Sequence, residues 1–363
     1  MVNFSINGFG RIGRSAMRVW LHNHLDDANL VAINTSGSQN VAGWAYLLRH
    51  DTAYGTLPYS ISSEEVQDPK EATDAKPIIG YITIEHPKKT LKIPVLAQRD
   101  PAKIPWVQFG VEVVIESTGA FTSLDKAILH LQGGARFVVL SAPAKGGGVP
   151  TAVLGVNDQD VITKDRTGTL SVISNASCTT NSVAPVADIL HSKIGILKAM
   201  LTTVHGYTDD QNLQDNSHRD LRRARAAAQN IVPTSTGAAI AATQAIPELQ
   251  GLFDGISLRV PVITGSITDF TFITRRSTSV EEINQIFMDA ANDPRYRGIL
   301  AVTDEPLVSS DIVGRPESSI VDLEMTRVVD GTLVKVLAWY DNEWGYANRL
   351  SLLSYLNSHF FSG

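Results

Sequence analysis

Two residues of this chain have the types that covalent chemistry requires, and Cys178 is the first. It is the one cysteine among 363 residues, and it stands between the strand-like LSVIS and SVAPVADILHSKIG, which is helical in character. A thiol at a helix N-terminus meets unpaired N–H groups and the positive end of the helix dipole, which lower its pKa. The same groups stabilise the oxyanion formed when the sulfur attacks a carbonyl. The position predicts a nucleophile; the alternative is a small buried hydrophobic residue.

The second residue is His205, which closes an apolar strand in AMLTTVHGYTDDQ and opens into a glycine-containing loop. Histidine polarises a thiol into a thiolate and passes protons during a chemical step. The other histidines are expected at the surface or in structural positions. The pair predicts a thiol nucleophile assisted by a histidine base.

The elements that would hold a cofactor begin at the N-terminus. NFSINGFGRIGRSAMRVWL predicts a strand, a turn and a helix, with Gly8, Gly10 and Gly13 in the G-x-G-x-x-G spacing. Gly8 permits the tight turn, Gly10 lets a pyrophosphate approach the backbone, and Gly13 lets the helix pack closely on the strand. The helix N-terminus then binds the phosphates. Because a second strand, NLVAIN, follows, the pattern favours a dinucleotide site over a glycine-rich turn with no ligand.

The end of that second strand bears on which dinucleotide binds. A carboxylate about 20 residues beyond the glycines normally holds the adenosine ribose 2′-OH, but the sequence here is INTSGSQN. A carboxylate repels a 2′-phosphate, whereas Thr35, Ser36 and Ser38 can donate hydrogen bonds to one. We therefore expect NADP, with dual use of NAD. The alternative is a loop substitution that leaves NAD as the cofactor.

Two later strands are expected to end beside the same ligand. VEVVIESTGAF and ARFVVLSAPAK each join an apolar strand to small polar residues, and the carboxyl ends of parallel strands face one crevice. Ser117, Thr118 and Ser141 are therefore expected near the cofactor. Residues 56–90 are polar and are predicted to form a surface excursion without chemistry.

Composition limits the class of protein. With 43% hydrophobic and 19% charged residues, a chain of 363 residues favours two domains. The net charge of −6 argues against a general nucleic-acid binder, which carries a basic surface. No apolar run approaches membrane-spanning length, and a lone cysteine builds neither an internal disulfide nor a thiolate zinc site. We expect a cytoplasmic protein with no metal, a plastid location being the alternative.

Six segments, taken in order, resemble the signatures of phosphorylating glyceraldehyde-3-phosphate dehydrogenase. They are NGFGRIGR, SNASCTTN, TTVHGYTDDQ, HRDLRRARAAAQNIVPTSTGAA, LRVPV and WYDNEWGY. The resemblance covers essentially the whole chain, and RRARAAAQNIVPTSTGAA is similar to the form found in photosynthetic and many bacterial members.

The resemblance implies reversible NAD(P)-dependent oxidation of glyceraldehyde 3-phosphate, with inorganic phosphate, to 1,3-bisphosphoglycerate in glycolysis or the Calvin cycle. Cys178 would attack the aldehyde with His205 as base, and hydride loss would leave a thioester that phosphate attacks. Two phosphate pockets are implied, and hydroxyls, N–H groups and guanidinium groups suit them. Their residues would be Ser177, Thr179, Thr208, Arg223, Thr236, Gly237 and Arg259. The alternative for RDLRRAR is a solvated basic face or an RNA-binding patch.

The resemblance also adds residues to the cofactor site. They are Arg11, Ile12, Arg99, Ser217 and Asn342. NAD-specific members carry Asp where Thr35 stands, and NADP-using members resemble this chain at Ser217, so both positions favour NADP. Arg99 would supply positive charge near the adenine end. In the SCTTNC pattern of many members the second cysteine is Ser182 here, a position that the family does not use as nucleophile.

The implied fold is α/β: a doubly wound Rossmann domain over 1–177 that binds NAD(P), and an α+β catalytic domain with a mainly antiparallel sheet over 178–341. Residues 342–363 would form a helix returning to the first domain, with Leu350, Leu353 and Phe360 near one face. A homotetramer is typical of the family. The alternatives are erythrose-4-phosphate dehydrogenase and a non-catalytic RNA-binding or scaffold protein of the same fold.

Overall fold

The structure, a computed structural model, describes residues 1–164 and 171–351 and divides into two compact units. Of the described residues, the first unit comprises Met1–Thr151 together with 160–164, 171–175 and 347–351. The second comprises Ala152–Gln159 and Ala176–Tyr346. The predicted domain limits differ from these units chiefly at residues 152–159 and 342–346.

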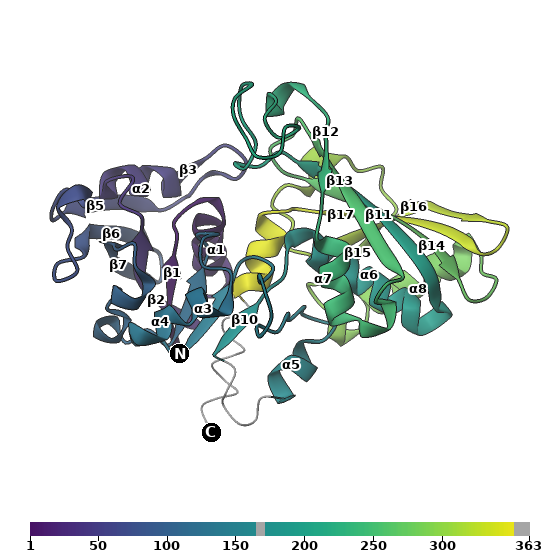
Figure 1. Cartoon of the computed structure of the whole chain (residues 1–363), viewed down its shortest axis with the longest axis horizontal. Helices are drawn as coiled ribbons and strands as arrows, with labels where there is room; N and C mark the ends of the chain where they lie inside the picture. Colours follow the sequence, from purple (N-terminus) through teal and green to yellow (C-terminus); the bar gives the residue numbers. More distant parts are fainter. Residues whose placement is uncertain (165–170, 352–363) are drawn as a thin grey trace. The chain divides into compact units, whose positions relative to one another are not determined.

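The first unit is built on an eight-stranded sheet with the strand order β10-β9-β8-β1-β2-β7-β6-β5 (Figure 1). From β10 to β7 every neighbouring pair is parallel, and β7, β6 and β5 pair antiparallel. The parallel strands are β1 (Val2–Asn7), β2 (Ala28–Thr35), β7 (Lys89–Ala97), β8 (Val113–Glu116), β9 (Phe137–Leu140) and β10 (Val172–Ser174). This order, with β2 on one side of β1 and β8 on the other, confirms the predicted doubly wound domain.

Sequence explains the elements around this sheet. Strand β8 is buried at every position, as expected where helices cover both faces of a parallel sheet. The helices are α1 (Arg11–Asn23), α2 (Val41–Arg49), α3 (Leu124–Ala127) and α4 (Leu129–Gln132). Helix α5 (Asp158–Lys164) begins in the second unit and continues into the first. A small hairpin, β3 (His50–Asp51) with β4 (Gly55–Thr56), follows α2.

The region 56–90, predicted to be a surface excursion, extends the sheet with β5 (Ser60–Glu65) and β6 (Ile78–His86). Most of β5 is exposed, in keeping with its polar sequence. In β6, however, Ile82 and Ile84 are fully buried. The prediction therefore missed β6, whose alternating isoleucines pack one face of an antiparallel strand against the rest of the unit.

The second unit has a seven-stranded sheet in the order β12-β13-β11-β14-β17-β16-β15. Pairs β13·β11 and β16·β15 are parallel and the other four are antiparallel, which confirms the predicted mainly antiparallel sheet. The strands are β11 (Ile196–Gly206), β12 (Val232–Ser235), β13 (Phe253–Val260), β14 (Ser266–Thr274), β15 (Leu300–Thr303), β16 (Ser319–Val329) and β17 (Leu333–Tyr340).

Helices α6 (Cys178–Ile194), α7 (Ala238–Ala245) and α8 (Val280–Ala291) pack on one face of this sheet (Figure 1). Residues Leu190, Leu201, Phe272 and Phe287 belong to the core between them. Because side chains alternate along a strand, every second residue of β11 points toward α6. This alternation directs His205 to the same side as Leu201.

Residues 344–351 are helical, and Leu350 is fully buried. Leu353 and Phe360, predicted to share its face, lie outside the described residues. Across residues 1–164 and 171–351, none of the helices is both long enough and apolar enough to span a membrane.

Candidate active site

The local backbone places Cys178 at the first position of α6. Ser177 is the N-cap, and its Oγ accepts a hydrogen bond from the Thr180 N–H at 3.0 Å. Just before it, Ala176 has a φ of +55°, in the left-handed region that a residue with a Cβ rarely adopts. The Tyr346 hydroxyl donates to the Ala176 carbonyl at 3.0 Å and holds this turn. The predicted strand-to-helix junction is confirmed, and the thiol stands at a helix N-terminus.

His205, one residue before the end of β11, faces this thiol. Its Nε2 atom lies 3.4 Å from the Cys178 sulfur. Its other ring nitrogen, Nδ1, lies 2.7 Å from the Gly206 carbonyl oxygen. A carbonyl oxygen only accepts, so we assign the hydrogen to Nδ1, which leaves the Nε2 lone pair toward the sulfur. This tautomer can take the thiol proton.

Arg259 lies on the far side of the His205 ring from the sulfur. The parallel pairing of β11 with β13 sets Arg259 opposite His205. Its Nη1 atom lies 3.2 Å from the Gly206 oxygen and 2.8 Å from His205 Nδ1. Because Nδ1 carries a hydrogen, we assign the Nη1 hydrogen bond to Gly206. The guanidinium thus places a positive charge beside the base.

Burial dominates the protonation of this pair. Burial, with the charge of Arg259 acting in the same direction, lowers the pKa of His205 to about 3, so the ring is neutral at physiological pH. Burial raises the pKa of the Cys178 thiol, although Arg259 and the hydrogen bonds of Thr179 lower it. The predicted fall in the thiol pKa is therefore wrong for the free chain, because desolvation of the sulfur exceeds the effect of the helix terminus.

A tyrosine closes the site on the side of β17. The Tyr340 hydroxyl lies 2.9 Å from Thr179 Oγ1 and 2.8 Å from Thr203 Oγ1. Burial raises the pKa of Tyr340, which keeps it protonated. The Tyr340 hydroxyl, which Thr203 holds in turn, thereby fixes Thr179 next to the predicted nucleophile.

The remaining predicted phosphate residues lie on segments after β11 and around α7. The Arg223 Nε–H donates to Thr234 Oγ1 at 2.9 Å, and the guanidinium pairs with Asp210. Thr208 donates its backbone N–H to Gln211 at 3.3 Å. Gly237 is the N-cap of α7, and Thr236 Oγ1 accepts from the Ala238 N–H. The structure thus places Thr179 and Arg259 next to the Cys178–His205 pair. The other predicted phosphate residues make local hydrogen bonds or cap a helix.

In the first unit the three glycines of the fingerprint have different surroundings. A Cβ on Gly8, where φ is +95°, would lie 2.7 Å from the Thr118 nitrogen. A Cβ on Gly13 would lie 2.1 Å from the Gly8 oxygen and 3.0 Å from Ile6. Gly10, the N-cap of α1, has open space at its Cβ position. These surroundings agree with the three predicted roles: a tight turn at Gly8, close packing of α1 at Gly13 and open space for a ligand at Gly10.

A buried carboxylate organises the strand ends next to this turn. Glu116 accepts from Asn7 Nδ2 at 2.5 Å, from His130 Nε2 at 3.0 Å and from the Thr118 N–H at 2.8 Å. Trp106 Nε1, which only donates, points at His130 Nδ1 at 3.1 Å. His130 therefore carries its hydrogen on Nε2 and donates it to Glu116. The network fixes Thr118, one of the predicted cofactor residues.

The other predicted cofactor residues of this unit lie at the same strand ends. Ser117 Oγ lies 2.6 Å from the Gly8 oxygen and 3.0 Å from the Asn7 oxygen, and the Ser141 N–H donates to the Glu116 carbonyl. Arg11 begins α1 and pairs with Asp51, and Ile12 follows it, partly buried.

Thr35 is not free to donate the hydrogen bond to a 2′-phosphate that the sequence predicts for it. It is buried, and its hydroxyl donates to the Leu96 carbonyl at 3.0 Å while accepting from the Gly37 N–H at 3.2 Å. A hydroxyl has one hydrogen, so Thr35 has none left for a phosphate. Arg99 lies nearby, with its Nε–H donating to the Ser36 carbonyl at 3.2 Å. At this strand end, therefore, the hydroxyl predicted to bind a 2′-phosphate is already used, and the predicted cation, Arg99, lies nearby.

Two predicted cofactor residues belong to the second unit. Ser217 is exposed, and its N–H donates to Asn216 Oδ1 at 2.7 Å. Asn342 is buried, and its Oδ1 faces Ser266 Oγ at 2.8 Å and Thr264 Oγ1 at 3.1 Å. Its Nδ2 amide makes no hydrogen bond to the residues that the structure describes, so the amide donor is available for a ligand.

Several residues of these networks were not predicted as site residues. They are Asn7, Glu116, His130, Thr203, Thr264, Ser266 and Tyr340. Glu116 stands directly before the predicted Ser117, and Tyr340 stands two positions before the predicted Asn342, each at a strand end, which is the signal that sequence offers. His130 and Ser266 come close only through packing. Within the described part of the chain, no three His, Cys, Asp or Glu side chains are grouped to hold a metal ion.

Comparison with known proteins agrees with this geometry. Residues 2–124 match the family model "Glyceraldehyde 3-phosphate dehydrogenase, NAD binding domain", and residues 177–342 match the corresponding C-terminal domain. The chain is 49% identical over 349 residues to glyceraldehyde-3-phosphate dehydrogenase 2 of Streptomyces arenae, covering 96% of each protein. It is 47% identical over 349 residues to the Zymomonas mobilis enzyme and 49% identical over 353 residues to the Mycobacterium leprae enzyme, with 96% of each protein covered. The chain therefore belongs to the glyceraldehyde-3-phosphate dehydrogenase family and is a nicotinamide-dependent oxidoreductase.

Proposed function

We propose that this chain oxidises glyceraldehyde 3-phosphate and couples the oxidation to uptake of inorganic phosphate, with Cys178 as nucleophile and His205 as base. The single observation that supports these roles most strongly is the distance of 3.4 Å between the Cys178 sulfur and the Nε2 atom of His205. A neutral histidine accepts the thiol proton as the sulfur attacks. The attack therefore does not require Cys178 to be ionised beforehand.

The sulfur adds to the aldehyde carbon, the carbonyl π pair moves to oxygen, and the thiol proton passes to His205. The result is a thiohemiacetal whose oxyanion is stabilised by N–H groups at the start of α6. The hydrogen on this carbon would leave as hydride to a bound nicotinamide. The oxyanion lone pair re-forms the C=O bond of the thioester, and His205 keeps the proton that it took from the thiol. Phosphate then attacks the thioester carbon, and the thiolate leaves with a proton from His205.

The phosphate pockets draw on the predicted donors around this pair. Arg259 lies closest to the reacting atoms, through His205 and Gly206. It is partly buried, and its Nε has no partner among the described residues. A partly buried guanidinium is a strong site for a phosphate oxygen. We assign Ser177, Thr179, Thr208, Arg223, Thr236 and Gly237 as the other phosphate contacts.

The cofactor of this proposal is NADP, with NAD as a second substrate. The fingerprint around Gly8, Gly10 and Gly13 would hold the pyrophosphate, and the free amide of Asn342 suits the nicotinamide carboxamide. Two observations support NADP: Thr35 brings no carboxylate to the end of β2, and Arg99 brings a positive charge to Ser36. A cation without a competing carboxylate favours a 2′-phosphate. Ser217 remains a proposed donor to it.

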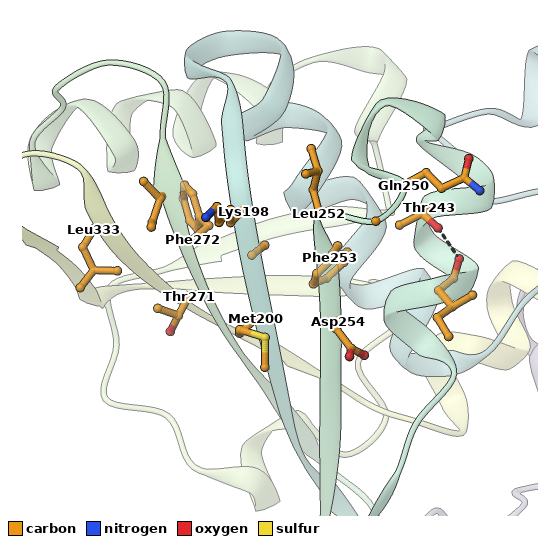
Figure 2. A pocket seen from close by; sticks show the side chains of 14 residues that line it. Lys198, Met200, Thr243, Gln250, Leu252, Phe253, Asp254, Thr271, Phe272 and Leu333 are labelled. Atoms are coloured by element: carbon orange, nitrogen blue, oxygen red, sulfur yellow. Dashed lines mark hydrogen bonds between the residues drawn. The ribbon is translucent and has the colours of Figure 1, made fainter.

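The chain is also proposed to form a homotetramer. On the sheet face of the second unit that points away from α6, the exposed apolar side chains include Met200, Ile256, Ile273 and Leu333. These residues adjoin a hollow of about 750 Å³. Figure 2 shows Met200, Thr271 and Leu333 among the side chains that line it. Lys198 and Asp254 also line it, so a two-fold contact of this face with a second copy would be charge-neutral. Exposed apolar faces of this kind mark protein interfaces.

We also propose that the protein is cytoplasmic. Its support is the single cysteine of the chain and the bacterial origin of the relatives. The relatives carry the glyceraldehyde-3-phosphate dehydrogenase name, so neither erythrose-4-phosphate dehydrogenase nor a non-catalytic scaffold is favoured.

The proposed reaction is tested by steady-state rates with glyceraldehyde 3-phosphate and with erythrose 4-phosphate. Each aldehyde is measured with and without phosphate, and with NAD or NADP as cofactor. We expect phosphate-dependent reduction of both cofactors with glyceraldehyde 3-phosphate and none in Cys178→Ser. An iodoacetamide label at one site per chain, with full inactivation, is the companion result. Preference for erythrose 4-phosphate, or activity in the serine variant, would overturn the proposal.

A further inference from the structure

A buried hydroxyl on β14 contacts both halves of the catalytic apparatus described above. Ser266, the first residue of β14, is fully buried. Its Oγ accepts the Gly206 N–H at 3.2 Å and lies 2.8 Å from Asn342 Oδ1. Gly206 directly follows the proposed base, and Asn342 is the proposed cofactor-binding amide.

The direction of these hydrogen bonds follows from the available donors. The Gly206 N–H can only donate, so Ser266 Oγ accepts it and keeps its own hydrogen for another acceptor. Asn342 Oδ1 is the acceptor within reach. The competing hydroxyl, Thr264 Oγ1, lies closer to the Asp341 carboxylate, at 2.9 Å, than to Asn342 Oδ1, at 3.1 Å. Ser266 is therefore the donor that fixes the amide of Asn342.

Fixing that amide has a chemical consequence. With Oδ1 held by Ser266, the Nδ2 donor points to the opposite edge of the side chain, where it has no partner among the described residues. An amide without the Ser266 donor can rotate and present its oxygen instead. A ligand carbonyl would then meet an acceptor, and the hydrogen bond would be lost.

The other hydrogen bond acts on the base. Ser266 anchors the peptide between His205 and Gly206, and the Gly206 carbonyl holds the hydrogen of His205 Nδ1 at 2.7 Å. The backbone has little room to shift here, because a Cβ on Gly206 would lie 2.9 Å from the Val262 oxygen and 3.0 Å from the Ile263 oxygen. The anchored backbone keeps the Nε2 lone pair toward the Cys178 sulfur.

We propose that Ser266 is a positioning residue whose single hydroxyl orients both the cofactor-binding amide of Asn342 and the tautomer of His205. The inference rests on the proposed roles of those two residues. It makes Ser266 neither a catalytic residue nor a ligand contact, since it acts through its neighbours.

The test uses the full-length chain and two readouts that need no turnover. The first is the dissociation constant for NAD and NADP, from quenching of tryptophan fluorescence. The second is the rate of iodoacetamide alkylation of Cys178 from about pH 6 to pH 9. Arg259, Tyr340 and His205 are the charged and titratable groups that face this thiol, and all remain in every variant.

For Ser266→Ala we expect about tenfold weaker binding of either cofactor, the equivalent of one lost hydrogen bond. Alkylation should be slower, with a changed pH profile. Thr264→Val, which leaves the Gly206 anchor intact, should weaken cofactor binding less and leave alkylation unchanged. Ser266→Thr keeps the hydroxyl and should restore both readouts wherever its added methyl is accommodated.

Ser319→Ala is the matched control. Ser319 is also fully buried and is also the first residue of a strand of this sheet, β16, but its Oγ has no hydrogen-bond partner within the described residues. Equal thermal unfolding of the two alanine variants excludes general destabilisation. If Ser266→Ala does not fold, Ser266→Gly removes the same hydroxyl and must show the same two shifts.

Ser266→Ala values equal to those of Ser319→Ala in both readouts would overturn the inference. This result is distinguishable from failure of the proposed function. If the wild-type chain binds cofactor and is alkylated but does not oxidise glyceraldehyde 3-phosphate, the proposed function fails. If it oxidises the substrate and Ser266→Ala matches the control, only the role of Ser266 fails.

Discussion

The Nε2 atom of His205 lies 3.4 Å from the sulfur of Cys178, although the two residues are 27 positions apart in the sequence. Cys178 begins helix α6, and His205 is the residue before the last of strand β11. Burial and Arg259 lower the pKa of His205 to about 3, so the ring remains an unprotonated acceptor across the physiological range. The thiol, whose pKa burial raises, thus faces a base that is always available.

His205→Asn should reduce the rate constant for aldehyde oxidation by about 10²–10⁴-fold, the usual contribution of a general base. The KM for glyceraldehyde 3-phosphate should change little, because the phosphate contacts remain. Steady-state kinetics measure both values. His50→Asn makes the same substitution at an exposed histidine of the other unit and should retain wild-type rates; a loss below tenfold in His205→Asn would argue against the base.

Arg259→Met should move the pH profile of Cys178 alkylation to higher pH. The charge of Arg259 lowers the thiol pKa, so without it only the hydrogen bonds to the sulfur oppose the effect of burial, and less thiolate exists at any given pH. An opposite charge at close range shifts a pKa by about 1–3, so alkylation near neutral pH should slow by about tenfold or more. Arg259→Lys, which keeps the charge, should stay close to wild type. An unchanged profile in the methionine variant contradicts this electrostatic role.

Glu116→Gln should weaken cofactor binding and destabilise the first unit. The new amide would point N–H donors at Asn7 and His130, which already donate to Glu116. Hydrogen bonds to a buried charged group are worth about 1.5–3 kcal/mol each, so we expect a loss of about 2–4 kcal/mol in the free energy of unfolding, measured in urea. Glu112→Gln, at a partly exposed carboxylate paired with Arg136, should stay within about 0.5 kcal/mol. Equal stabilities for the two variants would contradict the network.

Thr35→Asp should shift the cofactor preference from NADP toward NAD. Because the Thr35 hydroxyl already donates to Leu96, the effect comes from repulsion between the new carboxylate and a 2′-phosphate, together with its hydrogen bond to a ribose 2′-OH. The ratio of kcat/KM values should change by at least about tenfold. Ser217→Pro should act in the same direction but less. A wild-type chain that already prefers NAD strongly and does not respond to Thr35→Asp would refute the NADP proposal.

Met200→Glu should dissociate the proposed oligomer. Met200 is 58% exposed at the centre of the apolar face of β11, so a glutamate there costs a single copy little but would meet its own counterpart across a two-fold contact. Light scattering after gel filtration should give a lower mass than for wild type. Lys193→Glu, on the last turn of α6, should keep the wild-type mass. A monomeric wild-type chain would contradict the proposal directly.

The sequence by itself determined the elements and the residue types of the site. Short-range physics is sufficient for this: the glycine spacing specifies a turn between β1 and α1, and apolar strands with polar ends specify a crevice. Cys178 had to begin a helix because Ser177 is a good N-cap and the residues after it form a helix. His205 was recognisable because it closes an apolar strand. Six matching segments then identified the family.

The tertiary structure decided what these residues face, since that depends on contacts between distant segments. Pairing of β11 with β13 brings Arg259 to His205, 54 positions away, and packing brings His130 to Glu116. Burial is likewise a property of the whole fold, and it reverses the pKa change that the helix terminus alone suggests for Cys178. Thr35 and Ser266 show the same principle: one hydroxyl hydrogen has one acceptor, and the surrounding backbone determines whether that acceptor is a ligand, a carbonyl or a neighbouring side chain.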